Sequence, residues 1–213
     1  FGHRDQKLLA GTSFLREDTD AYTQSAMNAY VGLERKLSKD WWTSIKLFAE
    51  RGYVTRDEKN SYHYESIIWS IKRDTRNNML NPTSGTLFQI DLAPTTGFYL
   101  DNFSGISATA KAAVYYAPLS DDFLVLAGRA AIGSFLGANL QNIPPSLRFY
   151  CGGGGSVRGY SYQAIGPRDK YDEPVGGRSF QEVNIEARFR ATKDVGFVTF
   201  VDGGNVYDAQ MGG

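Results

Sequence analysis

The sequence predicts an all-β chain that forms an antiparallel transmembrane β-barrel. The first observation is a two-residue alternation of polar and apolar residues in segments of about ten residues or more. The second is a series of connections that alternate between short polar turns and longer loops. The third is composition: 13 Tyr, 13 Phe and 23 Gly in 213 residues, without an apolar run near the roughly 18 residues of a membrane helix.

The clearest alternation lies in residues 181–191. The even positions are polar or charged, and the odd positions are apolar: Glu182, Asn184, Glu186, Arg188 and Arg190 against Val183, Ile185, Ala187, Phe189 and Ala191. Because successive side chains of a strand point to opposite faces, this pattern puts every charge on one face.

We expect nine strands, at 4–16, 22–34, 42–50, 61–73, 86–92, 105–116, 121–136, 181–191 and 195–203. Short turns are expected at 38–40, 119–122 and 192–194, and longer loops at 52–60, 95–103 and 137–179. The link 74–85 is longer than its neighbours on the short-turn side. Bacterial single-chain barrels close with an even number of strands. The chain therefore has one strand more or fewer than this count, or it is the middle of a larger barrel.

A period-two chain also fits a soluble sandwich or a lipocalin-like barrel, in which the apolar face packs inward. Three features favour a membrane barrel. One polar face carries opposite charges, which suits a wet lumen. The apolar faces are rich in Ala and would fill a soluble core poorly. Aromatic residues crowd near segment ends, where they suit interfacial girdles; examples are Trp41, Trp42, Tyr115 and Tyr116.

Charge and chemistry exclude several functions. With 23 basic and 23 acidic residues, the chain is not a nucleic-acid binder that works by bulk charge. The lone Cys151 excludes an internal disulfide framework. His3 and His63 lie on separate segments without spaced partners, so we expect no metal, no cofactor and no enzyme activity. The glycines of 152–155 lack the spacing of a phosphate-binding loop.

Two motifs carry a family resemblance. Val157, Arg158, Gly159 and Tyr160 resemble the VRG(F/Y) tip of the long extracellular loop in the outer-membrane-protein assembly family, of BamA and TamA type. Phe200 to Gly204 resembles the F-x-D-x-G pattern that accompanies it. The turn at 81–85 and the stretch 158–167 look most like the TamA branch, the translocation and assembly module barrel. The resemblance extends from about residue 75 to 208.

The resemblance implies a 16-stranded barrel preceded by POTRA domains, of which these would be the fifth to thirteenth strands. Residues 1–213 are then a partial barrel domain, without the terminal strands and POTRA domains. The implied function is assembly: inserting and translocating autotransporter-like β-barrel clients in the Gram-negative outer membrane. The implied partners are outer-membrane lipids, unfolded clients and a subunit that spans the periplasm. A two-partner-secretion pore and a soluble lipocalin-like carrier are the alternatives. Cys151 departs from the small residue expected there.

Arg158 is the centre of the expected site. Its planar guanidinium suits a bidentate clamp on a carboxylate. We expect loop 137–179 to fold into the lumen, with Arg158 on Asp202 and with Glu186 as a second acceptor. Phe200 and Gly204 complete the expected acceptor strand. Glycines 152–155 and 159 are expected to allow close approach to the wall and positive φ. The alternative is that Arg158 is a solvated loop tip.

Overall fold

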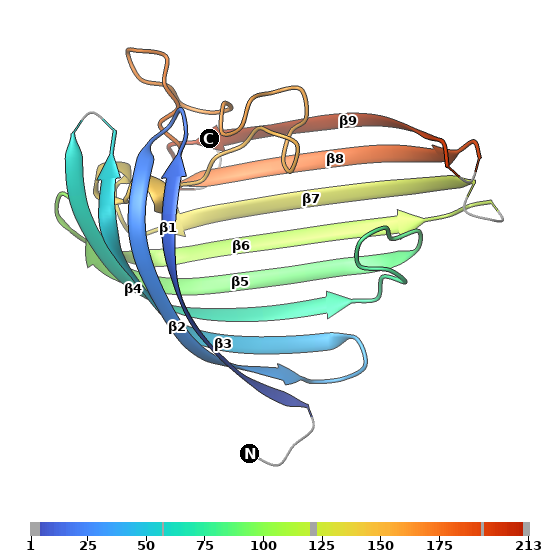
Figure 1. The fold of residues 1–213 in the computed structure, drawn as a ribbon, viewed down its shortest axis with the longest axis horizontal. Coiled ribbons are helices and arrows are strands. Elements are labelled where there is room, and N and C mark those ends of the chain that lie inside the picture. Colours follow the sequence, from blue (N-terminus) through green and yellow to red (C-terminus); the bar gives the residue numbers. More distant parts are fainter. Residues whose placement is uncertain (1–4, 57, 120–122, 193, 211–213) are drawn as a thin grey trace.

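The computed structural model describes residues 5–56, 58–119, 123–192 and 194–210. In these ranges the chain forms one antiparallel sheet of nine strands in sequence order (Figure 1). The strands are β1 (Gln6–Asp18), β2 (Thr23–Lys36), β3 (Trp41–Thr55), β4 (Lys59–Asp74), β5 (Gly85–Phe98), β6 (Asn102–Tyr116), β7 (Leu124–Leu136), β8 (Ser179–Arg190) and β9 (Gly196–Tyr207). The expected all-β antiparallel fold is confirmed.

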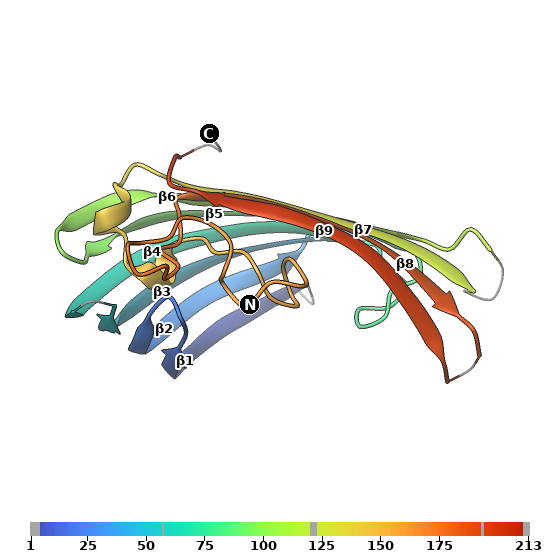
Figure 2. The same ribbon diagram turned by 90° about the horizontal axis from the view of Figure 1, so that it is seen from above.

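The sheet curves from β1 to β9 like the wall of an open barrel (Figure 2). Within the described residues, every strand pairs with its sequence neighbours, and β1 and β9 form the two edges. The connection 137–178 lies on the concave side (Figure 2). It contains two short 3-10 helices, η2 (Leu140–Asn142) and η3 (Pro145–Leu147). No helix in the described ranges is long and apolar enough to cross a membrane.

The two faces of β8 follow the alternation in the sequence. Val183 and Ile185 are 49% and 62% exposed on the outer face. Glu182, Asn184 and Glu186 form hydrogen bonds to the connection on the concave side. Large apolar side chains are thus exposed outward, as in a barrel whose outer face meets lipid.

Two of the expected long loops are wrong. Residues 52–55 and 59–60 continue the β3–β4 ladder, and residues 95–98 and 102–103 continue the β5–β6 ladder. Their Gly and Asn residues are typical of turns, but pairing with neighbouring strands overrides that preference. At the loop end of the sheet only the connection 137–178 is long among the described residues. β8 begins at Ser179, the last residue of the expected loop and two residues before the expected strand.

The strand β4 carries charged residues on both faces, because Glu65 and Lys72 stand at odd and even positions. Lys72 lies on the concave face, where its ammonium stacks over Trp42, whereas the exposed Glu65 lies on the outer face. Tyr115 also faces the concave side, beneath Arg188. The expectation that all segment-end aromatics form an outer girdle is therefore wrong for Trp42 and Tyr115, because their parity points them inward.

Candidate functional site

The base of the connection packs against the concave face of the sheet. We call residues 139–150 the root. Its Ile143 is fully buried in an apolar cluster that includes Ala21, Tyr22, Ala26, Val54, Tyr62, Tyr64, Tyr99, Phe103, Phe135 and Ala138. Arg148 donates hydrogen bonds to the carbonyls of Ile143 (3.0 Å) and Val175 (3.1 Å). Burial lowers the pKa of Arg148 and raises the pKa of Tyr150 to about 12. Ile143 of the root therefore packs against the sheet in a region from which water is excluded.

The tip of the connection, residues 152–160, is held by charge. Arg158 forms a two-pronged contact with Asp202 of β9: Nε donates to Oδ2 at 2.7 Å and a terminal nitrogen donates to Oδ1 at 2.8 Å. The backbone N–H of Arg158 donates to the same carboxylate at 3.0 Å. The other terminal nitrogen donates to Glu186 of β8 at 2.5 Å. The structure therefore brings Arg158 to both of the acceptors expected from the sequence.

Burial makes the loss of one partner costlier here than in a surface ion pair. The side chain of Asp202 is 1% exposed, against 16% for Glu186 and 25% for Arg158. Hydrogen bonding to Asp202 raises the pKa of Arg158 above its ordinary value. Removal of one partner would leave a desolvated charge uncompensated.

A second group of contacts beside Arg158 was not predicted from the sequence. Ser156 donates its hydroxyl to Glu182 at 2.5 Å, and its carbonyl accepts from Asn184 at 2.7 Å. Arg129 of β7 donates to the carbonyl of Gly155 at 2.6 Å and to Glu182 at 2.8 Å. The inward parity of these strand residues was the available signal, but their partners follow only from the folded loop.

Phe200 and Gly204 do not accept hydrogen bonds from the loop, contrary to the expected acceptor strand. The guanidinium of Arg158 lies 3.6 Å from the centre of the Phe200 ring, a cation–π contact. A Cβ at Gly204 would lie 2.9 Å from the buried side chain of Val157. Gly204 therefore makes space for Val157, because it lacks a side chain.

The expected roles of the loop glycines are only partly right. Gly152, Gly153 and Gly159 have φ values of 112°, 92° and 90°, a region that glycine adopts readily. A Cβ at Gly154, Gly155 or Gly159 would meet no atom within 4 Å, so no close approach to the wall requires glycine there. Tyr160 is 60% exposed, and its carbonyl accepts from the N–H of Gly153.

A series of polar side-chain contacts continues from the tip towards the opposite end of the sheet. Arg188 of β8 donates to Glu186, the second acceptor of Arg158. Its other nitrogen donates to the Asn81 side chain and the Pro82 carbonyl, both at 3.3 Å. These belong to the β4–β5 turn, which folds over the concave side (Figure 2). Glu186 thus links the tip to a turn at the other end of the barrel wall.

Cys151 precedes the tip and is 1% exposed. Its backbone bridges to Ile165, and burial raises the pKa of its thiol to about 11. Further out, Asp169 of the connection forms a 2.7 Å ion pair with Arg56, between β3 and β4. The described residues contain no group of three or more His, Cys, Asp or Glu arranged to hold a metal ion. His3 lies outside the described residues.

The comparisons with known proteins identify the family. The model of the Omp85 superfamily domain matches residues 3–212. The chain belongs to the Omp85 superfamily. It is 32% identical over 191 residues to the outer membrane protein assembly factor BamA of Neisseria meningitidis serogroup B. The aligned part is 84% of this chain and 23% of that protein. The chain thus spans less than a quarter of the length of that relative.

Solved structures agree on the fold. BamA from Haemophilus ducreyi lacking POTRA domains 1–3 aligns with a TM-score of 0.73 and 14% identity, over 95% of this chain and 46% of that one. CdiB from Acinetobacter baumannii aligns with a TM-score of 0.53 and 19% identity, over 87% of this chain and 32% of that one. The family resemblance, the barrel fold and the location in the Gram-negative outer membrane are confirmed. The narrower likeness to TamA stays a prediction.

Proposed function

We propose that the chain is part of a factor that inserts and translocates autotransporter-like β-barrel clients in the outer membrane. Residues 1–213 then form part of a 16-stranded barrel, with further strands and POTRA domains in the full-length protein. The proposed partners are outer-membrane lipids, unfolded clients and a periplasm-spanning subunit. The proposal includes no catalytic activity, cofactor or nucleic-acid partner.

The contact between Arg158 and Asp202 carries this proposal. It holds the tip against β9, and Glu186 extends the contact to β8. The connection therefore occupies the concave side and stiffens the wall formed by these strands. A factor that inserts clients into the bilayer through its wall needs such a fixed wall and no open central pore.

A polypeptide-secreting pore is the second candidate, and the structural likeness to CdiB favours it. A secreted chain would have to pass the concave side, so the tip would have to leave it. The lipocalin-like alternative is set aside by membership of the Omp85 superfamily.

The test uses the full-length protein in liposomes with two substrates: an autotransporter β-barrel and a secreted polypeptide without a barrel. The proposal predicts insertion of the barrel substrate and a severalfold loss in Arg158→Ala. Lys111→Gln is the matched control, an exposed charge on the concave face of β6. Transport of the polypeptide alone, with a larger ion conductance in Arg158→Ala, would instead support the pore.

A further inference from the structure

The outward side chains of β3 and β4 mark the two edges of the apolar belt. On β3 they change from Trp41 at one end, through apolar residues, to Arg51. At about 3.3 Å per residue and a tilt of about 40°, this interval is about 25 Å high, the usual height of the apolar band. Arg73 pairs with Trp41, and His63 pairs with Arg51. Arg51 on β3, with Glu65 and His63 on β4, therefore marks the belt edge nearest the long connection.

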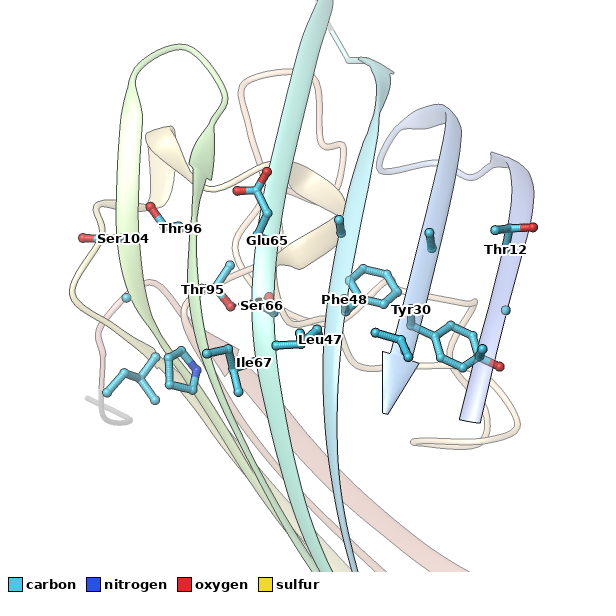
Figure 3. Close-up of a pocket in the computed structure, with 18 residues that line it drawn as sticks. Thr12, Tyr30, Leu47, Phe48, Glu65, Ser66, Ile67, Thr95, Thr96 and Ser104 are labelled. Carbon is cyan, nitrogen blue, oxygen red and sulfur yellow. Dashed lines mark hydrogen bonds between the residues drawn. The ribbon is translucent and has the colours of Figure 1, made fainter. Parts of the chain in front are cut away.

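An outward-facing groove crosses β1 to β6 just inside this edge. It is an open depression with a volume of 1210 Å³, and its residues come from six neighbouring strands at one height (Figure 3). Its large apolar side chains are on the outer face and exposed: Val31 at 46%, Leu47 at 56%, Ile67 at 48% and Ile106 at 44%. The β4–β5 ladder skips Pro94, which has no N–H to donate. The groove is apolar enough and long enough to hold a hydrocarbon chain.

A second hollow of 560 Å³ adjoins the groove and shares Ala29, Ala49 and Glu65 with it. Arg51 and His63 line this hollow. Among the described residues, Arg51 forms no ion pair, although it lies exposed on the outer face. The His63 ring stacks on Phe98 with 6.1 Å between centroids and keeps its polar edge available. A hollow that carries Arg51 and His63 beside the carboxylate of Glu65 thus opens directly into an apolar groove.

We propose that the groove and hollow together bind a phosphorylated glycolipid of the outer leaflet. Its acyl chain lies in the groove, and its phosphate accepts hydrogen bonds from Arg51 and His63. Arg is suited to a phosphate because its planar fork donates two parallel hydrogen bonds. Glu65, at the junction, repels a bare phosphate and accepts hydrogen bonds from sugar hydroxyls. This chemistry favours a glycolipid over a simple phospholipid.

The groove is continuous with the lipid-facing belt, which supports a lipid as its occupant. The inference requires the outer-membrane location but not the assembly function. A failure of lipid binding would therefore leave the insertion assay above unaffected, and the reverse also holds.

The test measures lipid retention by the full-length protein in detergent by native mass spectrometry. The probe is diphosphorylated lipid A, with phosphatidylcholine as the reference lipid. We expect Arg51→Gln with His63→Gln to lower lipid A binding at least tenfold and to leave phosphatidylcholine binding unchanged. The matched control is Arg35→Gln with Arg73→Gln, which removes outward cations from the opposite belt edge.

A second variant tests the acyl groove. Ala49→Trp fills the junction from its outer face, and we expect a similar loss of lipid A while heat-resistant gel mobility shows a folded barrel. Unchanged lipid A binding in either variant would overturn the proposal.

A competition experiment tests other occupants. Displacement of lipid A by millimolar inorganic phosphate would assign the hollow to a free anion, and displacement by an extended client peptide would assign the groove to clients. Either result would also overturn the proposal.

Discussion

The root and the tip of the connection 137–178 are held on the same sheet by different forces. The root buries Ile143 among tyrosines and phenylalanines of β4, β6, β7 and two turns between strands. The tip places Arg158 between two carboxylates of β8 and β9. Burial depends on shape and area, whereas a desolvated ion pair depends on each partner. The tip can therefore be released by one charge deletion while the root stays packed.

The largest effect is expected from breaking the pair at the tip. Arg158→Ala or Asp202→Ala leaves the other group uncompensated, at about 3–5 kcal/mol for a buried pair. We expect either variant to expose the tip to protease in the full-length protein and to leave the root protected. Protection of the tip equal to wild type would show that the pair does not hold it.

The double variant sharpens this prediction. Both substitutions break the two-pronged Arg158–Asp202 contact, and Asp202→Ala leaves only the Arg158–Glu186 contact in place. Arg158→Ala with Asp202→Ala should therefore open the tip little more than Arg158→Ala alone. Asp202→Asn is the milder control, because it keeps the shape and one acceptor oxygen. Additive effects on tip cleavage would mean that the two residues act separately.

The root should respond to volume and not to charge. Ile143 is fully buried, so Ile143→Ala should destabilise the root by about 3 kcal/mol through lost burial and a cavity. Ile143→Val should cost about 1 kcal/mol. Hydrogen exchange of residues 139–150 measures both. The root's opening should not change between 0.1 and 0.5 M salt; an opening that rises with salt would contradict its apolar character.

A smaller effect is expected at Arg188, which joins Glu186 to the β4–β5 turn. Arg188→Gln should loosen that turn by about 1 kcal/mol, since its contacts are partly exposed charged hydrogen bonds. Hydrogen exchange of residues 75–84 reports the change. Arg190→Gln, on the same face of the same strand, is the control and should leave the turn unchanged. Equal effects of the two variants would remove the proposed link.

The smallest effect is expected when the pH is lowered. The N–H of Glu173 donates to Asp169 and is the main cause that lowers the pKa of this carboxyl, with Arg56 contributing. A lowered folded-state pKa stabilises the native form above the unfolded value of about 3.9, and this contribution is lost as pH falls through the folded-state pKa. Pepsin should therefore cut residues 163–175 faster towards pH 2 than at pH 4.5. Asp169→Asn should remove that pH dependence; a dependence that persists would place its cause elsewhere.

Much of the fold follows from the two-residue pattern, because an outward apolar face and an inward polar face fix the side chains of residues 182–190 in β8. The pattern fails at strand ends. Gly52 and Tyr53 have turn-like composition but lie in the β3 ladder, since pairing with neighbours depends on residues far along the chain.

The charged part of the site could be predicted because Arg158 lies in a motif that resembles a known family's loop tip, and because Asp202 has inward parity on its strand. The contacts of Arg129 and Ser156 could not. Both residues reach backbone or side-chain groups that come together only when the connection folds onto the wall. Gly204 shows the same limit, because a glycine that makes space is not distinguishable in sequence from one that permits a turn.

The central claim is that breaking the Arg158–Asp202 pair releases the tip, although Ser156 and Arg129 also contribute contacts there. Cys151 reports on this release directly. The thiol is buried beside the tip, and its pKa is raised to about 11. Maleimide labelling of the membrane-embedded full-length protein at pH 7.5 should be slow in wild type. It should be at least tenfold faster in Arg158→Ala, in Asp202→Ala and in the double variant, and the factor for the double variant should equal that for Arg158→Ala. Wild-type labelling rates in the single variants, or a double variant whose rate is the product of both effects, would contradict the account.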